Sequence, residues 1–181
     1  MRPNYATNIE TPRAIGCGID FLDLQFENDF SFDIQRLASL IMPETKLISI
    51  TTPHNPTGVT LSEKQLREAA ALAESKGCYL LVDETYGEMN FAGPTPLAAS
   101  ISPRCISVAS VSKSYGLPGI RIGWVITRDR RLQEATRIAL TDNAIIPLYW
   151  ETSVWAFKDR YTYVGRSDQV TDVDGLSLKA K

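Results

Sequence analysis

A strand–helix–strand pattern within residues 46–82 constrains the fold more than any other feature of the sequence. Residues 46–52 form a short, β-branched run bounded by Pro53, and residues 78–82 form a continuous apolar run. Both runs are typical of buried strands, and a helical pattern separates them. This spacing predicts a βαβ unit, and therefore a parallel sheet with a right-handed crossover.

The helix between these two strands has clear boundary signals. Ser62 followed by Gln65 makes a capping box, and Gly77 supplies a left-handed stop. Apolar residues recur between them at the spacing of one helix face, namely Leu66, Ala69, Ala70 and Ala73. We therefore expect a helix over residues 62–77 with one face packed against the sheet.

Further elements are predicted upstream of this unit. Residues 19–26 mostly alternate apolar and polar side chains, which is typical of a strand with one wetter face. After them, Ser31 or Asp33 can cap a short helix that ends before Pro43. The apolar face of that helix would consist of Ile34, Leu37, Ala38 and Ile41.

Downstream, the apolar runs 104–108 and 120–126 predict two more strands, and residues 129–140 predict a helix. The order of all these elements favours an α/β fold. We expect a three-layer α/β/α sandwich, in which helices pack on both faces of a mostly parallel sheet.

Composition narrows the class of protein further. The chain has 181 residues, of which 44% are hydrophobic and 22% charged, and its net charge is −2. Because no stripe of Lys and Arg is present, we expect neither nucleic acid nor an acidic membrane surface as a partner. No apolar run approaches the roughly 20 residues that a membrane-spanning helix needs, and the N-terminus lacks the apolar core of a secretion signal.

The three cysteines support a location inside the cell. Cys17, Cys78 and Cys105 are isolated in sequence and odd in number, and two of them lie inside apolar runs. This pattern is more typical of reduced core residues in a cytosolic protein than of a disulfide framework. We therefore expect a cytoplasmic protein that acts on small molecules.

Polar side chains follow the ends of three predicted strands, where ligands bind in open α/β sheets. Asn55 follows the first, Asp83 and Tyr86 follow the second, and Ser110 and Lys113 follow the third. A pyridoxal cofactor needs such groups, because a lysine amine condenses with its aldehyde and an acid keeps its pyridine nitrogen protonated. A serine hydroxyl and an arginine can hold its phosphate.

Three segments carry a resemblance to a known family. They are P-H-N-P-T-G at 53–58, V-D-E-T-Y at 82–86, and S-V-S-K-S-Y-G-L-P-G-I-R-I-G-W at 110–124. In this order they resemble signature segments of the class I/II pyridoxal-phosphate-dependent aminotransferases, which have the aspartate aminotransferase fold (fold type I). The third segment is the most specific, because its serine, glycine and arginine stand at the family's offsets from the lysine.

The resemblance implies a role for each matching residue. Lys113 is similar to the Schiff-base lysine, and Asp83 to the aspartate that pairs with the pyridine nitrogen. Asn55 and Tyr86 match the two donors to the phenolic oxygen of the cofactor. The cofactor implied is pyridoxal 5′-phosphate, and no metal is implied.

Three further residues bear on the same site. Ser110 and Arg121 match phosphate ligands of the family, and Tyr5 is similar to the aromatic residue that stacks on the pyridine ring. Strand alternation would place Arg121 on the same face as Gly119 and Gly123, whose missing side chains would leave room for a ligand. His54 is the sole histidine, and we interpret it as a loop residue rather than an acid or base.

The activity that the resemblance implies is transamination, in which an amino group passes from an amino acid to a 2-oxo acid. Lys113, once displaced by the substrate amine, would serve as general base and acid at the substrate Cα. Family members usually build their active sites at a homodimer interface, so a homodimer is implied. The specific amino donor and acceptor are not encoded in the recognisable segments.

The resemblance covers residues 1–140, which correspond to a central part of the family's large domain, so the predicted fold is incomplete. The glycine-rich helix start that completes the phosphate site and the arginine that binds the substrate carboxylate have no match. Residues 141–181 are atypical: we interpret Trp150 and Trp155 as packing residues and expect the polar tail to be mobile.

Two alternatives to an aminotransferase, or a truncated form of one, therefore stay open. The first is a lyase, decarboxylase or amino-acid cyclase on the same fold, since the cofactor residues do not select the reaction. The second is a non-catalytic remnant that folds poorly alone or binds a partner, and an absent cofactor signal would favour it.

Overall fold

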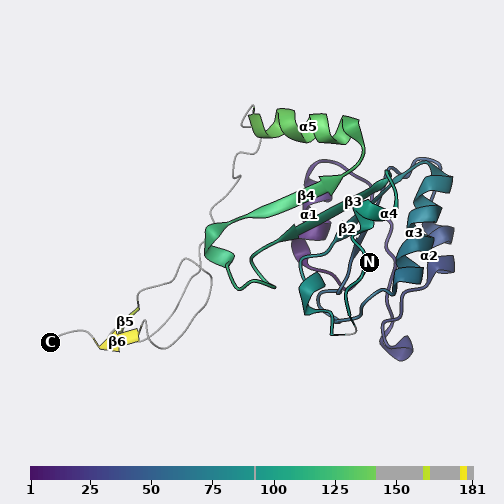
Figure 1. Cartoon of the computed structure of the whole chain (residues 1–181). Helices are drawn as coiled ribbons and strands as arrows, with labels where there is room; N and C mark the ends of the chain where they lie inside the picture. Colours follow the sequence, from purple (N-terminus) through teal and green to yellow (C-terminus); the bar gives the residue numbers. More distant parts are fainter. Residues whose placement is uncertain (92, 142–160, 164–175, 179–181) are drawn as a thin grey trace.

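The centre of the molecule is a four-stranded sheet in the order β1-β2-β3-β4 (Figure 1). The computed structural model describes residues 1–91, 93–141, 161–163 and 176–178. The strands are β1 (Leu47–Thr51), β2 (Tyr79–Asp83), β3 (Cys105–Ser110) and β4 (Gly123–Thr127). The first three run parallel to one another, and β4 is antiparallel to β3. The prediction of a mostly parallel sheet is confirmed.

The predicted βαβ unit is present. Helix α3 (Glu63–Lys76) begins at the capping box of Ser62 and Gln65 and ends at Gly77, which has a φ of 70°. Its buried residues are the four predicted ones, Leu66, Ala69, Ala70 and Ala73. They pack in one core cluster with alternate residues of the first two strands, Ile48, Ile50, Leu80 and Val82. Burial of this apolar face is what holds the helix on the sheet.

Other helices cover the sheet at different places. Helix α2 (Ile34–Leu40) is capped by Asp33, whose carboxylate accepts from the backbone N–H groups of Gln35 and Arg36. Helices α2 and α4 (Ala98–Ile101) both lie beside α3 on one side of the sheet (Figure 1). Helix α5 (Arg130–Thr141) lies next to β4, as the sequence predicted for residues 129–140. This arrangement confirms an α/β sandwich.

Helix α1 (Ala6–Ala14) and helix α4 were not predicted from the sequence. Helix α1 contains Pro12 and buries none of its residues, so it has no apolar stripe that could indicate a helix. Helix α4 has only four residues, which is too short for a helical period to show. Three short 3₁₀ helices complete the main body: η1 (Phe26–Asn28), η2 (Gly87–Met89) and η3 (Pro118–Ile120).

The strand predicted for residues 19–26 is wrong. This segment makes a single parallel bridge between Asp23 and Arg2 and then enters η1 at Phe26. Leu22 and Leu24 are nevertheless buried in the core, so the alternating pattern is correct for burial. A strand also needs a partner along most of its length, and the described residues offer one only at Arg2.

The strand predicted for residues 120–126 begins later than expected. Residues 118–120 form η3, Arg121 has a left-handed φ of 53°, and the strand proper starts at Gly123. Further along the chain, β5 (Tyr161–Tyr163) pairs antiparallel with β6 (Leu176–Leu178). The sequence predicted neither strand, and β6 lies within the polar tail at residues 167–181. Trp150, Trp155 and the rest of the tail lie outside the described residues.

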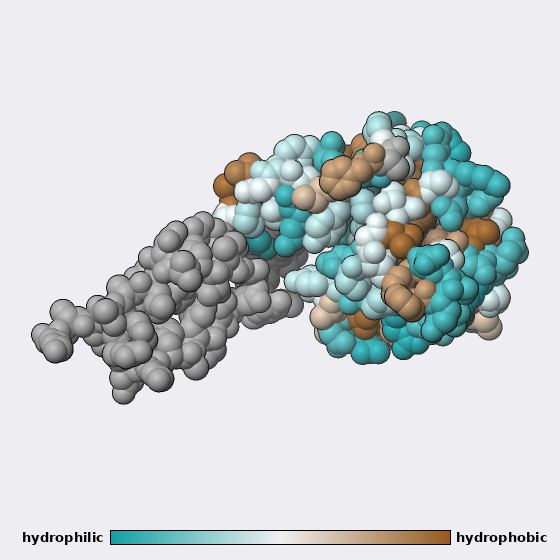
Figure 2. All heavy atoms as spheres, turned by 90° about the horizontal axis from the view of Figure 1, so that it is seen from below, coloured by the Kyte–Doolittle hydropathy of each residue, from teal (hydrophilic) through white to brown (hydrophobic). Residues whose placement is uncertain are grey.

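The surface mixes hydrophilic and apolar regions. Figure 2 shows brown apolar patches within a mostly hydrophilic face. Cys78 and Cys105 are buried, as expected for core residues, whereas Cys17 is exposed. Among the described helices, none is long and apolar enough to cross a membrane.

Candidate cofactor site

The site is built at the carboxyl edge of the three parallel strands. Thr51, Asp83 and Val108 stand opposite one another across β1, β2 and β3. Two backbone hydrogen bonds hold the strand ends together beyond this register: the N–H of Thr52 donates to the carbonyl of Asp83 at 3.0 Å, and that of Glu84 to the carbonyl of Val108 at 2.8 Å. Side chains that follow the strand ends therefore share one edge of the sheet.

The loop after β1 carries Asn55 and is held by internal hydrogen bonds. The N–H of His54 donates to the carbonyl of Val59 at 2.8 Å, and the N–H of Gly58 donates to the carbonyl of His54 at 2.7 Å. The Oγ1 of Thr52 accepts from the N–H of Leu61 at 2.9 Å. Asn55 is half-buried in the loop, so these bonds present its amide at a fixed place beside the strand end.

His54 stabilises this loop from inside. It is 3% exposed, and its Nδ1 lies 2.8 Å from the Oγ1 of Thr57. Burial lowers the pKa of His54, and the N-terminal charge adds to this effect while the Pro3 carbonyl opposes it. A buried, neutral imidazole bonded to its own loop supports our interpretation of His54 as a loop residue.

The segment after β2 carries Asp83 and Tyr86. The Oδ1 of Asp83 accepts from the N–H of Thr85 at 3.0 Å, which turns the chain directly after the strand. Tyr86 follows at the start of η2 and lines a hollow of about 520 Å³ together with Asn55 and Met89. The structure therefore brings Asn55 and Tyr86, which were expected to bind the same oxygen, to one hollow.

Lys113 lies in a tight turn after β3. The turn is closed by hydrogen bonds from the N–H of Leu117 to the carbonyl of Val111 and from the N–H of Gly116 to the carbonyl of Lys113, at 3.2 and 3.0 Å. Gly116 has a φ of 64°, which a residue without a side chain adopts freely. Within the described residues, the Lys113 amine makes no hydrogen bond or ion pair and is exposed.

Ser114 connects the Lys113 turn to the segment that contains Asp83. Its hydroxyl donates to the carbonyl of Thr85 at 3.0 Å. Thr85 itself is fixed by the carboxylate of Asp83. A chain of two hydrogen bonds thus joins the turn of the lysine to the aspartate, although the sequence analysis did not single out Ser114. A small hydroxyl beside the lysine is the signal that could have found it.

Ser110 is the last residue of β3 and faces Gly123 of β4. It lines a second hollow of about 360 Å³, to which Thr85 and Trp124 also contribute. Its hydroxyl accepts weakly from the N–H of Ser112 at 3.4 Å. Ser110 is therefore at the same edge of the sheet as the lysine turn, with an oxygen available to a ligand.

The backbone of Arg121 is not in a strand, in contrast to the prediction from the sequence. It lies outside β4 in a left-handed conformation, exposed, with its Nη1 donating to the carbonyl of Pro118 at 3.3 Å. Strand alternation therefore does not apply to Arg121 and Gly119. A side chain at Gly123 would come within 2.9 Å of the Ala109 carbonyl, so this glycine allows close approach of β3 and β4 rather than of a ligand.

Arg121 nevertheless lies near the end of the β3–β4 ladder that carries Ser110. The ladder pairs Ser110 with Gly123, and one further hydrogen bond joins the N–H of Val111 to the carbonyl of Ile122 at 3.2 Å. Arg121 directly precedes Ile122 in the chain and so lies just beyond this bond. The structure brings the two predicted phosphate ligands to one end of the ladder, without a direct hydrogen bond between them in the described residues.

Tyr5 reaches the same edge through the start of α1. It is the N-cap residue of this helix and 60% exposed. The Nδ2 of Asn8 donates to the Oδ1 of Asn4 at 3.0 Å and to the Oγ1 of Thr51 at 3.5 Å. Because Thr51 is the last residue of β1, these bonds fasten the first turn of α1 beside the other strand ends.

Glu84 is a half-buried acid that the sequence analysis passed over. Its Oε1 accepts from the N–H of Ala98 at 2.8 Å and from the hydroxyl of Ser107 at 3.0 Å, while its Oε2 is buried without a partner in the described residues. Burial raises the pKa of Glu84, against the effect of its two hydrogen bonds. Glu84 directly follows the end of β2, and its bond to the N–H of Ala98 anchors the start of α4.

Comparison with known proteins identifies the family. The family model "Aminotransferase class I and II" matches residues 1–145, so the chain belongs to this family. The arginine–pyruvate transaminase AruH of Pseudomonas aeruginosa is 31% identical over 127 residues, which are 68% of this chain and 32% of that protein. Tyrosine aminotransferase of Mus musculus is 30% identical over 133 residues, 72% of this chain and 29% of that protein.

A solved structure agrees in fold. A PLP-dependent aminotransferase from Streptococcus suis matches with a TM-score of 0.69 and 32% identity, covering 77% of this chain and 37% of that one. The chain thus spans about a third of the length of these relatives. The comparisons support pyridoxal phosphate as the cofactor of this family site.

The residues present fit this cofactor. At one edge of the sheet lie the Lys113 amine, which has no partner in the described part of the chain, a carboxylate at a strand end, and an amide and a phenol that share a hollow. Ser110 and Arg121 add a hydroxyl and a guanidinium at the neighbouring ladder end. These are the donor types that an aldehyde, a pyridine nitrogen, a phenolic oxygen and a phosphate require.

Proposed function

We propose that residues 1–140 are part of the cofactor-binding large domain of an aminotransferase that transfers an amino group from an amino acid to a 2-oxo acid. The observation that carries the proposal is the position of segments 53–58, 82–86 and 110–124 at one edge of the sheet. The relatives are themselves named transaminases or aminotransferases. Residues 141–181 are a separate C-terminal segment in this proposal.

Each side chain then has a defined task. When bound, pyridoxal phosphate supplies a ring that accepts electrons from the substrate Cα. Lys113 holds the cofactor covalently through its amine and, when released, moves the proton at the substrate Cα. Asp83 keeps a proton on the pyridine nitrogen, and Asn55 and Tyr86 donate to the phenolic oxygen.

The remaining residues position the ring and the phosphate. Ser110 would hold the phosphate through its hydroxyl, and Arg121 would hold it through its guanidinium. Among the described residues Arg121 is exposed and bonds to the Pro118 carbonyl alone, so its side chain is free to turn toward a phosphate. Tyr5 stacks on the ring from the start of α1.

Family resemblance supports a homodimer, and the buried thiols of Cys78 and Cys105 suit a reducing compartment such as the cytoplasm. Sedimentation of the purified chain at several concentrations tests the first of these. A mass of two chains that persists on dilution supports the dimer, and a mass of one chain at all concentrations contradicts it.

The cofactor part of the proposal is tested by absorbance. The protein is incubated with pyridoxal phosphate, and free cofactor is then removed by dialysis. We expect a visible band that persists in the wild type and in Lys64→Ala, a control whose side chain is 84% exposed and paired with Glu68. Lys113→Ala should lose the band while keeping its far-ultraviolet circular dichroism. A band that persists in Lys113→Ala, or that is missing from the folded wild type, contradicts the proposal.

The reaction is tested by product analysis with a panel of amino acids. Amino-group transfer that requires an added 2-oxo acid supports an aminotransferase. Carbon dioxide or an elimination product formed without a 2-oxo acid would instead favour a decarboxylase or lyase on the same fold. A folded chain with no cofactor band and no turnover of any amino acid would favour the non-catalytic alternative.

A further inference from the structure

The turn that carries Lys113 leaves the sheet beyond its last ladder bond. The final bond between the β3 and β4 segments at this end runs from the N–H of Val111 to the carbonyl of Ile122 at 3.2 Å. Past it, two hydrogen bonds within residues 111–117 close the turn on itself. Bonds within a turn fix its shape but not its position on the sheet, so the lysine needs a further contact to hold it in place.

Ser114 supplies that contact. Its hydroxyl donates to the carbonyl of Thr85 at 3.0 Å, although the two residues are 29 positions apart in sequence. Among the described residues, no other hydrogen bond joins residues 111–117 to residues 84–86. Ser114 is half-buried, so water competes less for this bond than it would at the exposed Lys113. The bond therefore sets where the lysine turn lies.

Thr85 is the junction between the two turns, because side chains bind both of its main-chain groups. Its N–H donates to the Oδ1 of Asp83 at 3.0 Å, and its carbonyl accepts from Ser114. The same segment is held to β3 by the bond from the N–H of Glu84 to the carbonyl of Val108. Ser114 thus attaches the lysine turn to a segment whose place on the sheet is already fixed.

A hollow of about 360 Å³ lies beside this junction. Thr85 and Ser114 both line it, together with Ser110 and Trp124. Because the two turns border open space here, packing alone does not fix the distance between them. A single hydrogen bond at this point therefore has more influence on that distance than it would in a close-packed core.

We propose that Ser114 is a positioning residue, which holds the Lys113 amine at a fixed separation from the Asp83 carboxylate through Thr85. The inference rests on the proposed function, because these are the amine and the acid between which the cofactor ring would bind. The ring is rigid and its aldehyde and its nitrogen have set positions, so both protein groups have to be placed together. Ser114 itself touches neither the ring nor the reacting atoms.

A direct contact of Ser114 with the cofactor phosphate explains its position less well. Ser110, a candidate phosphate ligand, lines the same hollow. The Ser114 hydroxyl already donates its proton to the Thr85 carbonyl, whereas the Ser110 hydroxyl donates to no other residue in the described part of the chain. A phosphate accepts hydrogen bonds, so Ser110 is the better donor to it.

The first test uses the cofactor-free protein and so depends on neither binding nor turnover. Amide hydrogen exchange is measured residue by residue in the wild type, in Ser114→Ala and in Ser114→Thr, which keeps the hydroxyl. The amides of Gly116 and Thr85 should exchange about fivefold faster in Ser114→Ala and at the wild-type rate in Ser114→Thr. The Thr85 amide is the decisive probe, because its own acceptor, Asp83, is unchanged in these variants.

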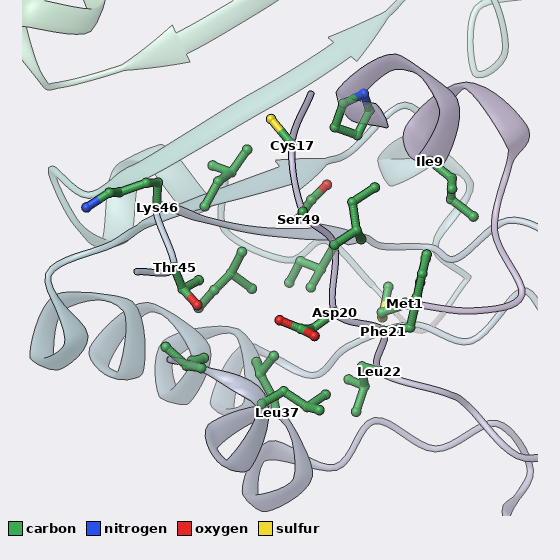
Figure 3. A pocket seen from close by; sticks show the side chains of 18 of the residues that line it. Met1, Ile9, Cys17, Asp20, Phe21, Leu22, Leu37, Thr45, Lys46 and Ser49 are labelled. Carbon is green, nitrogen blue, oxygen red and sulfur yellow. The ribbon is translucent and has the colours of Figure 1, made fainter. Parts of the chain in front are cut away.

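The matched control is Thr45→Ala. Thr45 is half-buried like Ser114, and its hydroxyl also bonds to the main chain, accepting from the N–H of Met42 at 3.0 Å. Figure 3 shows Thr45 in the wall of a groove of about 400 Å³, and none of the candidate cofactor residues, all of which are described, lines that groove. Thr45→Ala should leave both probe amides at the wild-type rate.

The second test measures two affinities from the visible band, one for pyridoxal phosphate and one for pyridoxal, which lacks the phosphate. Ser114→Ala should weaken both by the same factor, about tenfold, because the amine and the acid meet the ring rather than the phosphate. Ser114→Thr and Thr45→Ala should bind both compounds as the wild type does. A purely structural role would lower stability without changing these affinities at a temperature where the variant is folded.

Three results would overturn the proposal. They are an unchanged Thr85 amide in Ser114→Ala, wild-type affinity in that variant, and a weakening confined to pyridoxal phosphate, which would make Ser114 a phosphate ligand. A wild type that binds neither compound would contradict the proposed function and the positioning role with it. That failure is distinct from the other three, because it does not depend on any change at Ser114.

Discussion

The two ends of the central sheet, the packed end formed by β1 and β2 and the β4 end, differ in how well their apolar side chains are covered. In β2, Leu80 and Val82 are fully buried against α3, and the neighbouring Ile50 of β1 is 1% exposed. In β4, by contrast, Val125 is 53% exposed, and only Thr127 of that strand is buried. Both strands have strongly apolar sequences and both have paired backbones.

The difference shows that an apolar strand sequence does not by itself determine whether other elements pack on that strand. The β2 face is packed because α3 brings a continuous apolar stripe, fixed at both ends by its caps. Besides its partner strand β3, β4 contacts α5, yet four of its five residues stay exposed. The packed end should therefore contribute more to stability than the β4 end.

A matched pair of valines gives the largest expected contrast. Val82→Ala should lower the free energy of unfolding by about 2 kcal/mol, because it removes two buried methyl groups and leaves a cavity. Val125→Ala, the same change at an exposed position, should cost about 0.5 kcal/mol or less. Urea unfolding of both variants measures the difference. Equal losses would mean that β4 is covered as well as β2.

The helix cap should have the next largest effect. The Ser62 hydroxyl accepts from the N–H of Gln65 at 3.2 Å, so Ser62→Ala should cost about 1 kcal/mol by leaving a helix N–H unsatisfied. Ser75→Ala is the control, because its hydroxyl only bonds back to Leu72 within the same helix and alanine favours helix. A loss at Ser75 as large as at Ser62 would show that the cap is not what fixes α3.

Tyr79 links the packed end to the start of α5. Its hydroxyl donates to the Oδ2 of Asp129 at 2.7 Å, and this bond lowers the pKa of Asp129. Tyr79→Phe should raise that pKa toward its ordinary value of 3.8 and reduce stability by less than Ser62→Ala does. Because the folded-state pKa is lowered, the stabilisation exists above pH 3.8 and disappears as the pH falls.

A carboxyl titration by NMR, with thermal unfolding at pH 7 and pH 3, checks this prediction. The stability gap between wild type and Tyr79→Phe should narrow at the lower pH. A gap that is the same at both pH values would mean that the hydroxyl, rather than its bond to the carboxylate, matters.

The smallest expected effect is a change with pH in the contribution of Glu84 to the free energy of unfolding. Burial raises its pKa above the ordinary 4.5, so the protonated acid fits its site better than the carboxylate. The contribution of Glu84 is therefore complete below pH 4.5 and is lost as the pH rises through the raised folded-state pKa. Glu84→Gln should become more stable relative to wild type over that rise. A difference in the free energy of unfolding between wild type and Glu84→Gln that does not change with pH contradicts this prediction.

Local signals in the sequence predicted the packed end well. The capping box of Ser62, the stop at Gly77 and the cap at Asp33 each depend on neighbouring residues only, and all three are present. The predicted strand at 19–26 failed because pairing depends on a distant partner, which an alternating pattern does not report. The late start of β4 has a similar cause, since the turn through η3 and Arg121 competes with the strand.

The candidate site was predictable residue by residue but not in its contacts. The sequence placed Asn55, Asp83 and Lys113 after strand ends, and a parallel sheet brings such ends to one edge. It did not predict the bond from Ser114 to Thr85 that ties the lysine turn to the aspartate, nor the burial of His54. Those features depend on how loops fold over one another.

The most direct test of the central claim is to locate the cofactor on the chain. The protein is incubated with pyridoxal phosphate, reduced with borohydride, digested and analysed by mass spectrometry. The account predicts that the phosphopyridoxyl group is found on Lys113, at one group per chain, while the exposed Lys64 and Lys76 remain unmodified. Labelling spread evenly over these lysines, or absent from Lys113, would contradict it.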